Sequence, residues 1–159
     1  MKTNTCCFLG HRTINETEEL KSELCGIIKK LIVDEKVDTF LFGSKSRFND
    51  LCHEIVTKIK EKHPHIKRVY VRAGHPYISE HYKNYLLKSY EGTYCPKRVI
   101  GASRAVYVKC NDDMIDNSQI CIVYYDETNT SAMRKSGTKI ALDHAIKQGK
   151  QIILLPTER

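Results

Sequence analysis

Two kinds of apolar pattern alternate along the chain. Short runs in which most residues are apolar are typical of strands buried on both faces of a sheet. Between these runs, apolar residues recur at intervals of three and four, as in amphipathic helices. The predicted strands are residues 5–9, 39–42, 68–73, 119–125 and 151–155. The predicted helices contain residues 20–31, 51–59, 80–87, 103–116 and 138–146.

The order of these elements predicts the fold class. Strands that alternate with helices favour an α/β fold with right-handed crossovers, a mostly parallel sheet of five strands and helices on both faces. Residues 119–125 are apolar at nearly every position and should form a central strand. No domain boundary or repeat interrupts the pattern, so residues 1–159 are predicted to form a single domain of three layers.

Two stretches of the sequence are interpreted separately from this alternation. Asn15 followed by Glu18 resembles a capping box and is expected to begin the first helix. Residues 77–101 mix tyrosines and charges with a turn at Cys95-Pro96. We predict a short helix over residues 80–87, and the segment could serve as a lid, as an interface or as plain packing.

The composition is that of an ordinary globular protein. With 159 residues, 41% hydrophobic and 28% charged, the chain can bury a core that needs no disulfide or metal. The apolar run at residues 5–9 is too short for a signal peptide or a membrane span, which favours a cytoplasmic protein without a membrane partner. None of the seven cysteines belongs to a CxxC pair, and the adjacent Cys6 and Cys7 would point to opposite faces of a strand. We therefore expect reduced thiols, no zinc site or other metal, and no cofactor.

The charge adds an expectation about partners. A formal charge of +7 favours an anionic partner, which could be a nucleotide, a nucleic acid or an acidic protein. Much of the excess is lysine on the predicted helices, which solvated helix faces explain. A homo-oligomer is left open, because no patch in the sequence can be singled out as its interface.

Polar and glycine residues that follow the predicted strands form the candidate binding site. In parallel α/β sheets, ligands bind outside the carboxyl ends of the strands, near the point where the strand order reverses. This rule selects Gly10, His11, Arg12, Gly43, Ser44, Gly74, His75, Asp126, Ser136, Gly137 and Thr138.

These residue types suit an anion. Ser136, Gly137 and Thr138 at a helix start would offer backbone N–H groups and two hydroxyls to a phosphate, although Ser136 could equally be a simple N-cap. Arg12 could bind a phosphate or carboxylate through two parallel hydrogen bonds, or lie on the surface as an ordinary arginine. His11 is a weaker candidate, because nothing in the sequence supplies a partner that would orient its ring.

Two carboxylates on the second predicted helix extend the candidate site. Glu54 lies one turn after Asp50 and could accept hydrogen bonds from ribose hydroxyls. It could equally be a solvated carboxylate beside Lys58, four residues further on.

Four motifs occur in a specific order. They are Gly10-His11-Arg12, the glycine turn and Asp-x-x-x-Glu of residues 43–54, the segment 110–116 before the strand that leads to Asp126, and Ser136-Gly137-Thr138. Together they resemble the SLOG superfamily, and most closely its YpsA-like group of small bacterial proteins, over roughly residues 5–155. The resemblance implies a Rossmann-like fold that binds nucleotides or nucleotide-derived ligands, with relatives that range from ligand sensors to hydrolases that release a base from its ribose phosphate. It also implies that Asn111 would contact ribose or base together with Asp50 and Glu54.

The chain departs from the family's patterns at two places. YpsA-like proteins usually have an Arg-Asn pair where this chain has Cys110-Asn111, so a positive contact is missing or comes from Lys109 or Arg104. The phosphoribohydrolase branch carries Pro-Gly-Gly-x-Gly-Thr-x-x-Glu, whereas residues 133–141 lack both leading glycines and end in Ala141 instead of the glutamate. Alanine cannot stabilise the cationic ribosyl group that forms when an N-glycosidic bond breaks, which counts against hydrolysis of that type.

We therefore consider three hypotheses for the function. The first is a sensor or regulatory protein that binds an NAD- or ADP-ribose-like ligand. The alternative is a hydrolase or transferase that acts on the N-glycosidic bond of a nucleoside or nucleotide, with Glu54 as the catalytic carboxylate. The second alternative is binding of single-stranded nucleic acid, as in the DNA-processing protein DprA, whose Rossmann domain is related. Against it, the tyrosines of residues 77–94 do not alternate clearly with basic residues.

Overall fold

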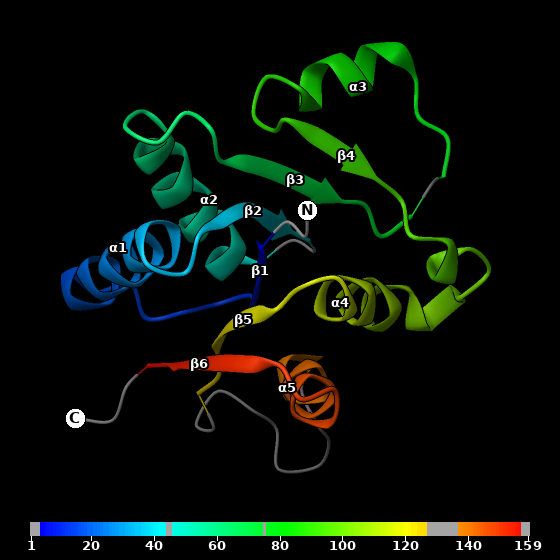
Figure 1. Ribbon diagram of the computed structural model, residues 1–159. Helices are drawn as coiled ribbons and strands as arrows, with labels where there is room; N and C mark the ends of the chain where they lie inside the picture. Colours follow the sequence, from blue (N-terminus) through cyan, green and yellow to red (C-terminus); the bar gives the residue numbers. More distant parts are fainter. Residues whose placement is uncertain (1–3, 44–45, 75, 127–136, 157–159) are drawn as a thin grey trace.

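A parallel β-sheet with helices against both of its faces forms the centre of the protein (Figure 1). The computed structural model describes residues 4–43, 46–74, 76–126 and 137–156. Among these residues, six strands form one sheet in the order β4-β3-β2-β1-β5-β6, and every neighbouring pair is parallel. The strands are β1 (Asn4–Gly10), β2 (Val37–Phe42), β3 (Lys67–Val71), β4 (Gly92–Tyr94), β5 (Ile120–Tyr124) and β6 (Gln151–Leu155).

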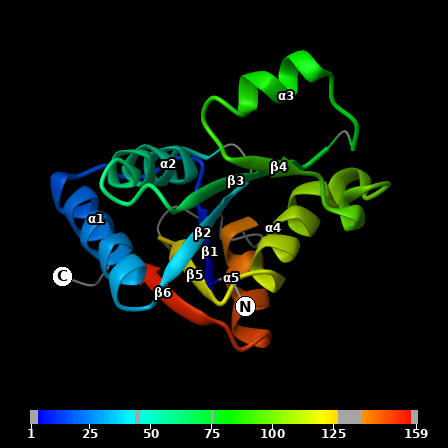
Figure 2. The ribbon, with the colours of Figure 1, turned by 45° about the horizontal axis from the view of Figure 1, so that its top comes forward.

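The helices cover the sheet from two sides. They are α1 (Glu18–Val33), α2 (Arg47–Lys60), α3 (Glu80–Leu86), α4 (Val106–Asp116) and α5 (Gly137–Lys147), with short 3-10 turns at Lys97–Val99 and Ser103–Ala105. Figures 1 and 2 show α1 and α2 on one side of the sheet and α4 and α5 on the other, while α3 lies beside β4 at the edge. This arrangement confirms the predicted α/β class and the helices on both faces.

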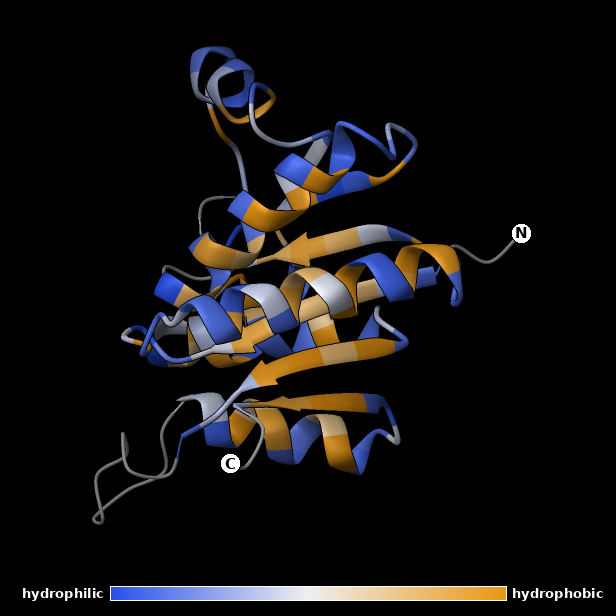
Figure 3. Ribbon diagram, turned by 90° about the vertical axis from the view of Figure 1, so that its left-hand side faces the viewer, coloured by the Kyte–Doolittle hydropathy of each residue, from blue (hydrophilic) through white to orange (hydrophobic). Residues whose placement is uncertain are grey.

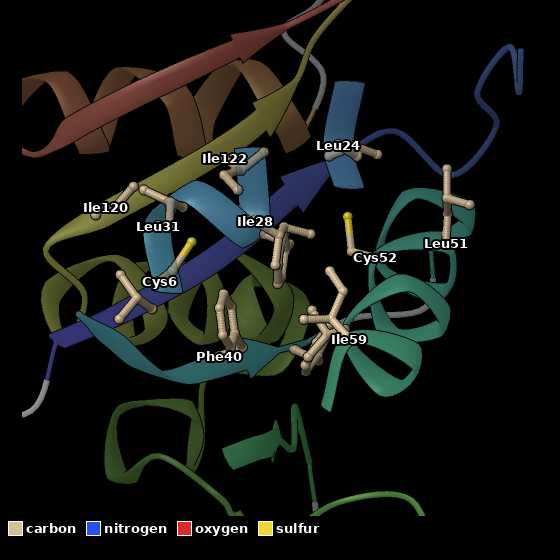
Figure 4. Packing of buried hydrophobic residues seen from close by; sticks show 14 of the residues in the cluster. Cys6, Leu24, Ile28, Leu31, Phe40, Leu51, Cys52, Ile59, Ile120 and Ile122 are labelled. Carbon is tan, nitrogen blue, oxygen red and sulfur yellow. The ribbon is translucent and has the colours of Figure 1, made fainter. Parts of the chain in front are cut away.

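Each interior strand divides its side chains between two cores. Cys6 and Phe8 of β1 belong to the core beneath α1 and α2, whereas Cys7 and Leu9 belong to the core beneath α4 and α5. Successive side chains of a strand point to opposite faces, so a strand covered on both sides must be apolar throughout. Figure 4 shows the first core and Figure 3 the predominantly apolar strands between helices of mixed hydropathy. Two-sided burial therefore explains the continuous apolar runs in the sequence.

The prediction of five strands is wrong, because the structure has β4 as a sixth. This strand consists of Gly92, Thr93 and Tyr94, which are only partly buried and pair with β3 alone. Three residues at the edge of a sheet are too few to produce an apolar run. The prediction that residues 77–101 form a lid or an interface stays a prediction, although part of the segment is built into the sheet.

The first helix also begins differently from the expected capping box. Thr17 is the N-cap of α1, and its hydroxyl accepts a hydrogen bond from the Leu20 N–H at 3.0 Å. Asn15 lies before the helix, and its N–H donates to the Tyr124 hydroxyl at 3.3 Å. The loop after β1 is thereby tied to the end of β5.

Within the described ranges, no helix combines the length and apolarity of a bilayer-spanning segment.

Candidate functional site

The strand order reverses between β1 and β5, which lie side by side in the middle of the sheet. The chain follows β1 with α1 on one face and β5 with α5 on the other, so the carboxyl ends of these two strands form a topological switch point. The register places Gly10 beside Tyr124, and the residues that follow both strands are close together. Ligands of open α/β sheets bind at such a position.

His11 joins the two strands at this switch point. Its Nε2 accepts a hydrogen bond from the Asp126 backbone N–H at 3.0 Å, and its ring is tilted against the Tyr125 ring at 5.6 Å between centroids. The side chain is buried, and burial lowers the pKa of His11, although the nearby Asp126 opposes the shift. A nitrogen that accepts a hydrogen bond carries no proton, so His11 is a neutral imidazole protonated on Nδ1. Asp126 is the orienting partner that the sequence did not reveal.

Arg12 follows His11 and faces solvent. Its carbonyl oxygen accepts a hydrogen bond from the Arg47 N–H at 3.0 Å, which joins the loop after β1 to the first residue of α2. The guanidinium of Arg12 is exposed and forms no ion pair within the described part of the chain. A cation that has no acidic partner among the described residues could pair with an anionic ligand at this edge.

Close packing requires the glycine that ends β1. A Cβ on Gly10 would overlap Phe48 of α2, so helix packing accounts for this glycine independently of any ligand. A Cβ on Gly43, which follows β2, would lie 2.5 Å from Met114 Cε of α4, the end of a flexible side chain that can shift.

Asn49 holds the ends of β1 and β2 against α2, although the sequence analysis did not select it. Its Oδ1 accepts from the Gly43 N–H at 3.1 Å, while its Nδ2 donates to the Phe8 carbonyl at 3.4 Å and to Ser46 Oγ at 3.0 Å. Ser46 is the N-cap of α2, and its hydroxyl also accepts from the Asn49 N–H at 3.0 Å. The sequence does contain a signal for this arrangement, since serine three residues before a polar side chain is the spacing of a helix start.

Asp50 and Glu54 lie one turn apart on α2 but have different surroundings. Glu54 is exposed, and its Oε1 is 3.3 Å from Arg47 Nη1. Arg47 also binds Glu16 from the loop before α1, with Nη2 and Oε1 2.7 Å apart. Asp50 instead lines a cavity together with His53 of the same helix. The two carboxylates are thus neighbours on α2, but only Asp50 is among the described lining residues of the cavity.

This cavity, of about 410 Å³, lies between the ends of β2 and β3 and the helices α2 and α3. We call it the aromatic cavity, because most of its lining residues carry rings. The rings belong to Phe42, His53, Tyr70, Tyr82, Tyr85 and Tyr90. Sequence reasoning placed three of these tyrosines in an uncertain segment and could not connect them with α2.

The inner wall of the aromatic cavity is ordered by contacts among its rings. His53 Nε2 donates a hydrogen bond to the Ser89 carbonyl at 2.9 Å, and the His53 ring lies 4.6 Å from that of Tyr90. Tyr90 in turn stacks on Tyr70, with 5.3 Å between centroids. The rings are thus positioned by the fold before any ligand binds.

The other predicted site residues are distributed around the same edge of the sheet. Asn111 is half-buried on α4. The thiol of the preceding residue, Cys110, donates a hydrogen bond at 3.6 Å to the carbonyl of Val71, the last residue of β3. Thr138 is buried in the first turn of α5, and Gly137 is the exposed first residue of that helix. Gly74 lies beyond the end of β3. Ser44, His75 and Ser136 lie outside the described residues.

The arrangement gives two neighbouring groups of candidates. His11 and Asp126 meet at the switch point, where Gly10 and Arg12 flank His11 in the chain, whereas Asp50 and Gly43 border the aromatic cavity. The first turn of α2 separates the groups and is bonded to both through Arg47 and Asn49. No three described His, Cys, Asp or Glu residues cluster as metal ligands would.

Comparison with known proteins adds no family assignment. No family model matches the chain, and no curated protein matches it either. The resemblance to the SLOG superfamily therefore stays a prediction from the four sequence motifs.

Proposed function

We propose that the protein binds a nucleotide or a nucleotide-derived ligand at the carboxyl edge of its sheet, as a sensor or regulatory protein of the SLOG type. A ligand of this class joins a flat base to anionic phosphate through ribose. It therefore needs ring faces, hydrogen-bond acceptors and a positive group within one site.

The observation that carries the proposal is the aromatic cavity beside the switch point. Its rings could stack on a base, and Asp50 could accept hydrogen bonds from ribose or base. The exposed Arg12 lies on the loop that is bonded to the first turn of α2, within the same edge of the sheet. It could pair with phosphate through charge-assisted hydrogen bonds.

A thermal-shift titration with AMP, ADP-ribose, NAD and cyclic nucleotides tests the proposal. A ligand present at a hundred times its dissociation constant stabilises the folded protein by about 2.7 kcal/mol and raises the melting temperature. If none of these compounds changes the melting temperature, the proposal fails.

The role of Arg12 is tested with the ligand found in that titration. Arg12→Ala should weaken binding by about 1.5–3 kcal/mol, the range of a hydrogen bond to a charged group. Lys62→Ala is the control, because it also removes one exposed cation but lies beyond the far end of α2. An Arg12→Ala protein with unchanged affinity would place the phosphate elsewhere.

The enzymatic alternative requires Glu54 to act on an N-glycosidic bond. Release of free base from nucleosides and nucleotides can be followed by chromatography, with Glu54→Gln as the comparison. Any turnover that survives this substitution unchanged excludes Glu54 as the catalytic carboxylate.

A further inference from the structure

The aromatic cavity differs in charge from the protein as a whole. The chain has a formal charge of +7, yet Asp50 is the only acidic residue among the described lining residues, and none of them is lysine or arginine. A phosphate or carboxylate placed there would face Asp50, and no lysine or arginine among the described lining residues would compensate its charge. The cavity therefore selects against anionic groups.

Tyr70 and Tyr90 on the inner wall of the cavity remain neutral and present their rings. Burial, with a contribution from Asp50, raises the pKa of Tyr90 to about 12, and burial also raises the pKa of Tyr70. Neutral phenol rings have electron-rich faces that attract cations, and the attraction is stronger where water is excluded. The five phenyl and phenol rings of the lining and the Asp50 carboxylate thus provide both a diffuse and a localised negative potential.

We infer that the aromatic cavity binds a positively charged nitrogen heterocycle of the pyridinium class. The flat cation would lie against the tyrosine faces, and Asp50 would be its counter-ion. A volume of about 410 Å³ accommodates a single substituted ring together with part of an attached sugar. The inference rests on the proposed function only in that such a ring would be the base of the nucleotide-derived ligand.

The decisive experiment compares a matched pair of small probes. The probes are 1-methylnicotinamide, which is a pyridinium cation, and nicotinamide, its neutral counterpart, each titrated by calorimetry at constant ionic strength. We expect the cation to bind at least tenfold more tightly than the neutral ring. Equal affinities, or tighter binding of nicotinamide, would overturn the inference.

Substitution of Asp50 tests the counter-ion. Asp50→Asn should weaken binding of the cation at least fivefold and leave binding of nicotinamide unchanged, because only the cation interacts with the charge. Glu61→Gln removes the same charge from the far end of α2 and should change neither affinity. Cation binding that survives Asp50→Asn overturns the assignment of the counter-ion and with it the inference.

Substitution of Tyr82 tests whether the cation contacts the face of a ring. Tyr82 is 41% exposed on α3, so its substitution should leave the hydrophobic core intact. Tyr82→Phe keeps the face and should retain the affinity within about twofold, whereas Tyr82→Leu should weaken the cation severalfold. Equal loss in both variants would contradict a contact with the ring face.

These probes also separate the inference from the proposed function. If 1-methylnicotinamide binds and no nucleotide does, the cation site stands and the nucleotide proposal fails. If ADP-ribose and AMP bind but the cation does not, the nucleotide proposal stands and the cation site is refuted.

Discussion

His11 is a buried, neutral side chain whose protonation would break the hydrogen bond from Asp126. Burial holds its pKa below the ordinary value of 6.5, so the unfolded chain takes up a proton first as the pH falls. The stability that His11 contributes is therefore present above that value and is lost progressively below it. Between about pH 7.5 and pH 5.5, the free energy of unfolding should fall more steeply in the wild type than in His11→Gln.

Urea denaturation at several pH values measures this difference. His81→Gln is the control, because His81 is exposed on α3 and its substitution should preserve the wild-type pH dependence. Identical pH profiles for the wild type and His11→Gln would show that the imidazole does not link folding to protonation.

Gly10 permits the contact between β1 and the Phe48 ring. Gly10→Ala should lower the free energy of unfolding by about 1–3 kcal/mol, since an added methyl group overlaps that ring. Gly26→Ala is a matched comparison, because Gly26 is exposed within α1 and has open space around it. That variant should instead be more stable by about 0.5–1 kcal/mol. Chemical denaturation of both proteins checks the opposite signs.

Asn49 satisfies backbone groups at the ends of two strands. Asn49→Ala leaves the Gly43 N–H and the Phe8 carbonyl without their side-chain partner, and we expect a loss of about 1–3 kcal/mol in stability. Asn84→Ala on the exposed surface of α3 should change stability by less than about 0.5 kcal/mol. Similar effects of the two substitutions in urea denaturation would contradict the structural role of Asn49.

Among the elements, β4 is short and depends on side chains to stay in the sheet. Arg68 of β3 is buried and reaches Glu91, the residue before β4, with Nη2 and Oε2 2.8 Å apart, while the Arg68 N–H donates to Oε1 at 2.8 Å. Partial burial raises the pKa of Glu91, but the hydrogen bonds from Arg68 outweigh it, so the pKa of Glu91 is lowered. This pair anchors the edge of the sheet that carries α3 and the outer wall of the aromatic cavity.

Glu91→Gln should therefore loosen this edge more than the rest of the sheet. We expect a loss of about 1–3 kcal/mol, with the stability from the ion pair present above a pH of about 4.5 and lost as the pH falls further. Amide exchange should accelerate in β4 and α3 while β1 and β5 stay protected. Uniform acceleration across all strands would mean that the pair stabilises the whole fold and not its edge.

The sequence predicted interior elements better than edge elements. Strands β1 and β5 are covered on both faces, and that environment demands the apolar runs from which they were predicted. Strand β4 has no such environment, because Gly92 and its neighbours are half-buried at the edge. The cap of α1 was misassigned because asparagine and threonine are both good cap residues. In the structure the Thr17 hydroxyl accepts from the Leu20 N–H, whereas Asn15 lies before the helix.

The site was predicted as a set of residues, not as an arrangement. His11 and Asp126 were both selected, but their contact depends on β1 lying beside β5, which no local pattern encodes. Asn49 was missed because a buried asparagine on a helix resembles a solvated one in sequence. The aromatic cavity requires α3 to return toward α2, which follows from the pairing of β3 with β4.

The whole molecule has a formal charge of +7, so both nucleotides and nucleic acids could be attracted to it. The dependence of affinity on salt concentration distinguishes these two kinds of ligand. A ligand with one or two phosphates should lose less than about tenfold in affinity between roughly 50 and 200 mM salt. A nucleic acid that contacts six to ten phosphates would lose about a thousandfold or more. Calorimetry or fluorescence anisotropy with NAD and with a labelled single-stranded oligonucleotide distinguishes the two. Tight oligonucleotide binding with a steep salt dependence would favour the nucleic-acid alternative.

The adjacency of β1 and β5 also governs how the chain can assemble during synthesis. His11 and Asp126 are 115 positions apart, so the switch point cannot form until most of the chain has left the ribosome. The sequence up to β4 can pair early, but the side of β1 that will receive β5 stays an open strand edge until residue 120 has emerged. Nascent chains halted before β5 would expose that edge in the apolar centre of the sheet. We expect such chains to aggregate or to bind chaperones.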